Sequence, residues 1–179
     1  MVDPGTLLAT THQAGDGLRV RLRLCRPSDG RRVRTFLDHL SPETRHRRFL
    51  VATPQVGDNH VRHFTFYDPR ERLVVAATHP EGRAEAIVGL ADCALLETGL
   101  AELALVVADD AQGRGVGKLL SEVIAGLARQ QGATHLKAEL LDNNLPMRRL
   151  MERLGPTTRS VEDGVAVLYT ALPARARAA

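Results

Sequence analysis

The chain has 179 residues, 44% of them hydrophobic and 25% charged, which is enough for one globular domain with its own core. Aromatic residues make up only 3% and Trp is absent, which argues against nucleic-acid recognition through stacked aromatic rings. The formal net charge of +3 suits an anionic ligand, and no apolar run reaches membrane-spanning length. We therefore expect a single domain with neither nucleic-acid nor membrane partners.

The cysteine pattern argues against a metal site and against a disulfide framework. Cys25 and Cys93 lie in apolar, strand-like runs and lack metal-ligand spacing, so we expect buried free thiols. His60, His63 and Asp68 also match no strong metal pattern, so no bound metal is expected. The chain opens without a signal peptide, which favours a cytoplasmic location.

Hydrophobic periodicity and turn signals predict one domain over residues 18–172. The polar residues 1–17 are expected to form a flexible arm or an added edge element, and residues 173–179 a C-terminal tail. In chain order the predicted elements are a strand at Leu18–Cys25, helices at Gly30–Leu40 and Ser41–Leu50, a loop from Thr53 to about Asn59 with a short segment to Tyr67, strands at Leu73–Thr78, Ala84–Leu96 and Leu100–Val107, a helix at Gly115–Gln131, a strand at Thr134–Leu141, a helix at Asn144–Leu154, and strands at Thr157–Val161 and Val165–Leu172. The segment Pro80-Glu81-Gly82 predicts a hairpin turn.

The segment Val106–Leu120 carries the clearest functional signal. Three glycines stand in alternate positions between an apolar strand and an apolar-periodic helix, which presents backbone N–H groups to an anion at a helix N-terminus. A dinucleotide fingerprint would need its third glycine where Lys118 or Leu120 stands, and Leu119 breaks the nucleotide-triphosphate pattern. Both of these phosphate-binding patterns therefore fail.

The remaining pattern, Gln112-x-x-Gly115-x-Gly117, resembles the acyl-CoA pyrophosphate loop of the GNAT superfamily of N-acetyltransferases. A glycine-rich turn without a ligand is the alternative. The predicted order of strands and helices over residues 18–172 is also that of the superfamily. The segments Leu24–Gly30 and Leu40–Phe49 are similar to the catalytic domain of bacterial Pat-type protein lysine acetyltransferases.

This resemblance implies an α/β (α+β) fold of the GNAT type. Its central sheet would be mixed and mostly antiparallel, with about seven strands flanked by about four helices. The fourth and fifth strands would splay apart. A homodimer is common in the family, so the resemblance also allows one here.

The resemblance implies transfer of an acetyl group from acetyl-CoA, as cosubstrate, to a primary amine by direct attack. A protein lysine is the favoured acceptor. A small-molecule amine is the alternative, and so is a non-catalytic CoA-binding sensor module. The run Arg45-His46-Arg47-Arg48 lies where family members line the acceptor entrance, and it could recognise an acidic patch or form a solvated helix face.

The resemblance also assigns cofactor-binding residues. A backbone strand would pair with the pantetheine arm, the glycine loop would hold the pyrophosphate, Lys118 would add a charge or remain solvated, and an Asn would open the last helix. The matching residues are Leu105, Val106, Val107, Gln112, Gly113, Arg114, Gly115, Val116, Gly117, Lys118 and Asn144, with Asn143 as the alternative to the last.

Glu102 is the predicted general base. It is the only carboxylate in the run Leu100–Val107, where burial would raise its pKa towards the working pH. It also matches the Ala-Glu-x-Ala position of the base in Pat-type enzymes. An outward-facing surface Glu is the alternative, and Asp92 and Glu85 are weaker candidates for the same role.

One position departs from the family pattern. The family often has a Tyr in the last helix as general acid to the thiolate, but Met151 stands there. The only tyrosines are Tyr67 and Tyr169. Either the thiolate leaves without this help or another group donates the proton.

Overall fold

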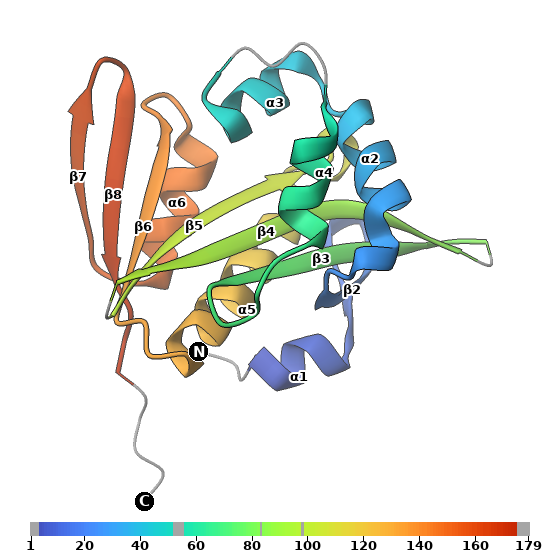
Figure 1. Cartoon of the computed structure of the whole chain (residues 1–179), viewed down its shortest axis with the longest axis horizontal. Helices are drawn as coiled ribbons and strands as arrows, with labels where there is room; N and C mark the ends of the chain where they lie inside the picture. The colour runs from blue at the N-terminus through green and yellow to red at the C-terminus, as the bar shows by residue number, and fades with distance from the viewer. Residues whose placement is uncertain (1–3, 52–55, 83, 98, 175–179) are drawn as a thin grey trace, which may run out of the picture.

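The structure is a computed structural model that describes residues 4–51, 56–82, 84–97 and 99–174. Its centre is an eight-stranded sheet of strand order β1-β2-β3-β4-β5-β6-β8-β7. Neighbouring strands run antiparallel, except for the parallel pair β5 and β6. Helices cover both faces of the sheet (Figure 1). The predicted mixed, mostly antiparallel sheet is confirmed, with one strand more than expected.

The bounds of the elements follow. The helices are α1 (Pro4–Ala9), α2 (Gly30–His39), α3 (Pro42–Phe49), α4 (Asp58–Thr65), α5 (Val116–Gln130) and α6 (Leu145–Leu154), and the strands are β1 (Thr11–Gln13), β2 (Arg19–Leu24), β3 (Arg72–Glu81), β4 (Ala84–Glu97), β5 (Leu100–Val107), β6 (His135–Leu141), β7 (Thr157–Glu162) and β8 (Val165–Ala171).

The sheet separates two hydrophobic cores, because successive side chains of a strand point to opposite faces. Leu103 and Val107 of β5 belong to the core that includes residues of α5 and α6. Val106 belongs to the core that includes residues of α2 and α4. Glu102 and Val106 are four residues apart on β5, so their side chains point to the same face of the sheet. Glu102 therefore lies on the face opposite α5.

The N-terminal segment forms the added edge element and not a flexible arm. Strand β1 pairs with β2, and Leu7 of α1 is buried in the core beneath the sheet. Gly126 of α5 makes this packing possible, because a Cβ there would stand 3.2 Å from Pro4. Residues 1–3 and most of the predicted C-terminal tail lie outside the described residues.

Two further predictions need correction. Asp58–Thr65 forms the helix α4, where only a loop and a short segment were predicted, and Phe64 is completely buried beneath it. The hairpin between β3 and β4 is longer than expected, because β3 continues through Glu81. Its turn includes Gly82, whose φ of 58° lies in the left-handed region that favours glycine.

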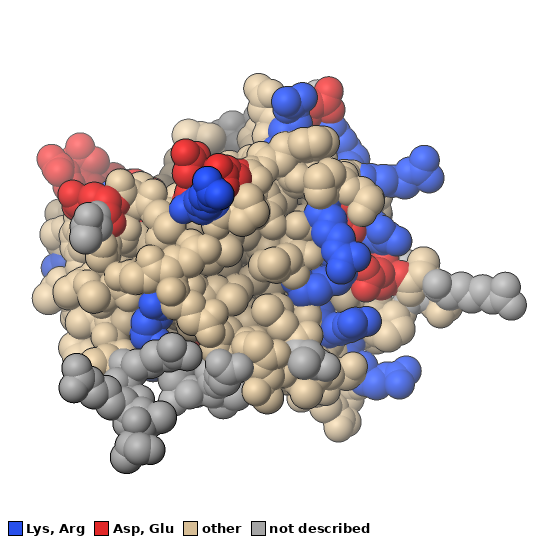
Figure 2. Space-filling model, turned by 60° about the horizontal axis from the view of Figure 1, so that its bottom comes forward, with Lys and Arg blue, Asp and Glu red and all other residues tan. Residues whose placement is uncertain are grey.

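Basic side chains gather at one end of the molecule. In Figure 2 they lie on the side that carries α2, β2 and the β3–β4 hairpin in Figure 1. In the residues that the structure describes, no helix is both long and apolar enough to cross a membrane. Cys25 and Cys93 are buried free thiols, as predicted.

Candidate active site

Strands β5 and β6 diverge soon after they begin. They pair only at Leu100–Glu102 and His135–Lys137, and α3 lies above the opening that follows (Figure 1). The stretch Leu103–Val107 pairs with β4 along one edge but with no described strand along the other. An extended chain could therefore add to this free edge through backbone hydrogen bonds.

A cavity of about 410 Å³ lies along this edge. Its walls come from α3, β5, the glycine loop, α5 and α6. They comprise Thr44, Arg47, Arg48, Leu105, Val106, Val107, Ala111, Gln112, Gly113, Gly115, Gly117, Lys118, Asn144, Pro146, Met147, Arg149 and Leu150. The structure thus brings together every predicted cofactor residue except Arg114 and Val116.

The two exceptions point away from the cavity. Val116 is completely buried in the core beneath the sheet. The Arg114 guanidinium donates to the carbonyl of Gly15 at 3.2 Å. The sequence pattern marked the whole loop, but it did not indicate which side chains face the cavity.

The glycine loop depends on backbone conformations that other residues rarely adopt. Gly113 and Gly115 have φ values of 71° and 89°. At Gly117 a glycine is favoured by close packing and not by its backbone conformation, because a Cβ there would stand 3.2 Å from the Leu150 side chain of α6. The loop leads into α5, whose first-turn N–H groups have no carbonyl partner within the helix and carry its positive dipole end. This geometry suits an anion.

The loop is held by the start of α3. Asp109 accepts hydrogen bonds from the Ser41 N–H and hydroxyl and from the Thr44 hydroxyl, at 2.9, 2.7 and 2.6 Å. The Gln112 amide donates to Thr44 Oγ1 and to the Val107 carbonyl, both at 3.1 Å. Desolvation would raise the pKa of Asp109, but these hydrogen bonds lower it. Sequence reasoning missed Asp109, because its partners are distant in the chain.

Cationic side chains from three helices line the cavity. They are Arg47 and Arg48 of α3, Lys118 of α5 and Arg149 of α6. Arg47 and Arg48 are already paired with Glu43 and Asp92, so the cations available to a phosphate group are chiefly Lys118 and Arg149. The cavity therefore combines a free strand edge with a basic, glycine-lined end, which matches the extended pantetheine arm and the phosphates of CoA.

Asn144 serves the fold and also lines the cavity. Its side chain accepts a hydrogen bond from the Met147 N–H at 3.2 Å and so caps α6. The neighbouring Asn143 is absent from the cavity lining. Both readings of Asn144, as helix cap and as cofactor contact, are therefore compatible with its position.

Glu102 occupies the last paired position of β5 before the strands part. Its side chain is 37% exposed, and an oxygen lies 3.9 Å from Lys137 Nζ. It does not line this cavity but lies at the point where the strands diverge, on the sheet face away from α5. The burial assumed from the apolar run is only partial, because the face it shares with Lys137 is open to solvent.

The two weaker base candidates are held by cations. Burial alone would raise the pKa of Asp92, but Arg48, His63 and Arg72 lower it to about 2. Burial likewise opposes the lowering of the Glu85 pKa, which is caused by Arg23. Carboxylates stabilised in this way are weak proton acceptors.

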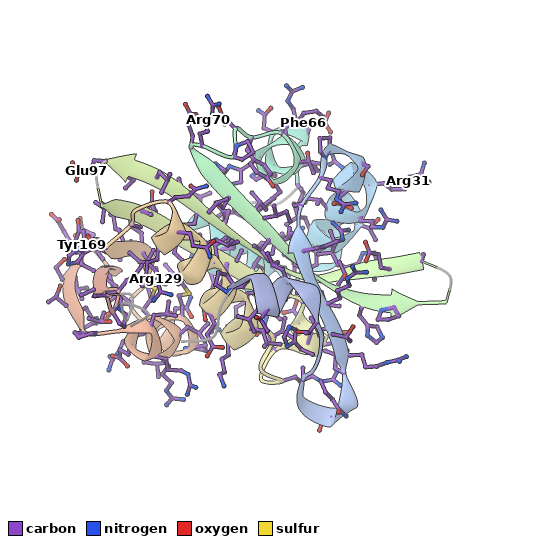
Figure 3. The ribbon with its side chains drawn as sticks, turned by 90° about the horizontal axis from the view of Figure 1, so that it is seen from below. Arg31, Phe66, Arg70, Glu97, Arg129 and Tyr169 are labelled. Atoms are coloured by element: carbon purple, nitrogen blue, oxygen red, sulfur yellow. The ribbon has the colours of Figure 1, made fainter. Side chains whose placement is uncertain are left out.

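Neither tyrosine lies in the last helix or lines the cavity. Met151 is completely buried. The Tyr67 hydroxyl donates to the Cys25 carbonyl at 2.8 Å, and burial raises its pKa to about 12. Tyr169 projects at the β7–β8 side of the molecule, at the opposite end from Arg31 (Figure 3), and does not line the cavity.

Known proteins with similar sequences and structures are acetyltransferases. Residues 35–155 match the model of the acetyltransferase (GNAT) family. The chain belongs to this family. It is therefore an acyl-CoA-dependent N-acetyltransferase of the GNAT fold, with acetyl-CoA as its cosubstrate.

Two relatives illustrate the range of similarity. The chain is 30% identical to Acetyltransferase PA5475 of Pseudomonas aeruginosa over 156 residues, which cover 86% of this chain and 84% of that protein. It is 35% identical to Acetyltransferase Pat of Mycolicibacterium smegmatis over 74 residues, which cover 41% of this chain and 22% of that protein.

Solved structures confirm the fold. The GNAT domain of S. lividans PAT matches with a TM-score of 0.80 and 30% identity, covering 91% of this chain and 96% of that one. The structure of yncA from Salmonella typhimurium with its cofactor acetyl-CoA matches with a TM-score of 0.66 and 18% identity, covering 89% and 96%. The predicted resemblance to GNAT enzymes and to the Pat-type domain is confirmed.

Proposed function

We propose that this GNAT enzyme acetylates lysine side chains of proteins, with Glu102 as the general base. The observation that carries the proposal is the position of Glu102, at the point where β5 and β6 part and on a sheet face open to solvent. A carboxylate there lies between the cavity that suits acetyl-CoA and the surface from which an amine can approach.

The cofactor would run along the free edge of β5. The pantetheine arm would pair with the backbone of Leu105–Val107, and a backbone N–H would polarise the thioester carbonyl. The pyrophosphate would bind the N–H groups of Gln112–Gly117 at the start of α5. Lys118 and Arg149 would add positive charge near the phosphates.

The reaction requires a neutral amine. Glu102 would accept a proton from the acceptor ammonium, directly or through water, and the amine nitrogen would then attack the thioester carbon. CoA would leave as a thiolate. We propose that the thiolate leaves without a tyrosine donor, which the modest basicity of a thiolate permits.

The open face supports a macromolecular acceptor. On β6, β8 and β7, alternate side chains face away from α5 and α6 and are partly or fully exposed, including Glu139 and Tyr169. A lysine on the surface of another protein could reach Glu102 across this face. The similarity to Pat-type proteins points the same way, whereas an enclosed acceptor pocket would favour a small amine.

Substitution of Glu102 tests the base. We expect Glu102→Gln to lower kcat about 100-fold or more while the KM for acetyl-CoA changes little, because general-base catalysis contributes on this scale. Glu139→Gln is the matched control, since Glu139 shares the same lysine partner and sheet face. An equal loss in both variants would attribute the effect to Lys137 electrostatics, and an unchanged Glu102→Gln enzyme would rule out the base.

The acceptor is tested separately. Purified enzyme and labelled acetyl-CoA are incubated with a cell lysate that has been split into protein and small-molecule fractions. Label on protein lysines, identified by mass spectrometry and absent with Glu102→Gln, supports the proposal. Label confined to small amines would assign the enzyme to small-molecule acetylation instead.

A further inference from the structure

Lys137 is one of only two lysines in the sequence, although Lys and Arg together number 24. Arg fills the other basic positions, and a guanidinium stays charged at all physiological pH values and so does not serve as an acyl acceptor. Lysine can lose its proton and attack a thioester. The chain therefore places one of its two possible lysine acceptors beside the proposed base.

The contacts of Lys137 define its position closely. It is the cross-strand partner of Glu102, at the last pair before β5 and β6 diverge. Its Nζ lies 3.9 Å from a Glu102 oxygen and 2.5 Å from a Glu139 oxygen. The side chain is 21% exposed. The ammonium thus lies within reach of two carboxylates, that of the proposed base Glu102 and that of Glu139.

The surroundings direct this amine towards the acceptor side of the sheet. Leu136 and Ala138, the neighbours of Lys137 on β6, are completely buried, so Lys137 points to the opposite, open face. Tyr169 of β8 is its other cross-strand partner and marks the outer side of this face (Figure 3). Lys137 therefore lies between the cofactor edge of β5 and the outer strands.

We propose that Lys137 is itself an acetylation site, modified by the acetyl-CoA bound to the same chain. The inference rests on the proposed function, because it uses Glu102 as the base. A proton passes from the Lys137 ammonium to Glu102, and Nζ attacks the thioester carbon. The new amide C–N bond forms as the C–S bond breaks, and CoA leaves as a thiolate that takes up a proton.

Acetylation would change the acceptor face. The acetylated side chain is neutral, so it can no longer form an ion pair with Glu102 or Glu139. Glu102 would then be free to pair with the ammonium of an external acceptor. The hydrogen bond to Glu139, opposed by slight burial, raises the pKa of Lys137 and keeps it protonated. Little neutral amine is therefore present, and we expect the modification to be slow. Each chain has a single Lys137, which the reaction consumes, so no repeated turnover is expected.

The test incubates the full chain with acetyl-CoA and no acceptor, followed by intact mass measurement and peptide mapping. The wild type should gain one acetyl group at Lys137, at a rate per molecule that does not depend on protein concentration. Lys137→Arg, which keeps the positive charge, should gain none at position 137. Glu102→Gln should slow the reaction about 100-fold.

Lys118 is the internal control. Its side chain is 50% exposed, against 21% for Lys137, so unassisted chemical acetylation would favour Lys118. Acetyl groups confined to Lys118 or the N-terminus, an unslowed Glu102→Gln variant, or a rate that rises with protein concentration would each overturn the inference. Thermal melts of the variants verify that they fold.

The outcome separates this inference from the proposed function. If the wild type and Lys137→Arg both acetylate lysate proteins while Lys137 stays unmodified, only the self-acetylation fails. If neither enzyme modifies lysate proteins and Lys137 is nevertheless acetylated in a Glu102-dependent reaction, the external acceptor proposal fails and the inference stands.

Discussion

Asp109 accepts two hydrogen bonds from Ser41, one from the backbone N–H at 2.9 Å and one from the hydroxyl at 2.7 Å. The two residues lie 68 positions apart in the chain, at the entrance to the glycine loop and at the N-cap of α3. Thr44 extends the contact, because it donates to Asp109 and accepts from Gln112. The helix above the cofactor cavity and the loop at its basic end are therefore one connected unit.

We expect Asp109→Asn to raise the KM for acetyl-CoA. The substitution replaces an acceptor of three hydrogen bonds with an amide that also donates, and the loss of about 1 kcal/mol in loop positioning corresponds to roughly a fivefold change. Steady-state kinetics with varied acetyl-CoA measures the effect, and kcat should change little. Asp110→Asn is the control, since it makes the same change at the neighbouring carboxylate, which forms none of these hydrogen bonds to α3. An unaltered KM in Asp109→Asn would refute the linkage.

Gly115 provides a sharper test of the loop. Its φ of 89° costs an alanine roughly 1–2 kcal/mol, and any relaxation moves the N–H groups that would face the pyrophosphate. Gly115→Ala should therefore raise the KM for acetyl-CoA about tenfold or more. Gly132→Ala is the matched control, because Gly132 has a φ of 95° at the other end of α5 and a Cβ there would meet no neighbour within 4 Å. We expect similar losses of thermal stability in both variants, and equal KM values would count against the anion site.

The elements around the cofactor cavity could be predicted because their signals are local. β5 spans Leu100–Val107 as predicted, since an apolar run ends at the glycine loop, and α5 begins within one residue of its predicted start. The amphipathic helix α4 was missed, because its apolar residues are few and its sequence is rich in His and Arg. α1 is short, and its place depends on packing against α5.

The contacts that complete the site could not be predicted from sequence. Asp109 and Ser41 are brought together by the packing of α3 against β5, with α4, β3 and β4 between them in the chain. The ion pair of Glu102 with Lys137 depends on the register of a parallel strand pair. Sequence spacing carries no register information across such distances. The sequence therefore indicated the type of site and most of its cofactor residues, but not the lysine beside the proposed base.

The two cysteines should be inert in the native enzyme. Burial raises the pKa of both Cys25 and Cys93 to about 12, so almost no thiolate is present at neutral pH. A thiol reagent should label neither cysteine in the folded protein and both in denaturant. Incubation with saturating acetyl-CoA should leave this result unchanged, and rapid labelling of either thiol in the native state would contradict the buried positions.

Among the ion-paired residues, Asp92 is the one whose substitution we expect to lower the free energy of unfolding most. Its carboxylate is 6% exposed and pairs with Arg48 at 2.5 Å and with Arg72 at 2.9 Å. Asp92→Asn should lower the free energy of unfolding by about 3–5 kcal/mol, because it leaves partly buried cations without their counter-charge. Glu152→Gln, which breaks the exposed pair with Arg148, should cost no more than about 1 kcal/mol. Urea unfolding of both variants measures the difference.

The ion pairs of Asp92 should also make the free energy of unfolding depend on pH. The pKa of Asp92 is lowered from its ordinary 3.8 to about 2 in the folded protein, so the unfolded chain binds the proton more tightly. Its contribution to stability is therefore complete above about pH 4 and is lost as the pH falls towards 2. Asp92→Asn has no such group, so its free energy of unfolding should fall less steeply than that of the wild type across this window. Parallel pH profiles for the two proteins would show that Arg48 and Arg72 do not stabilise the Asp92 carboxylate as the structure implies.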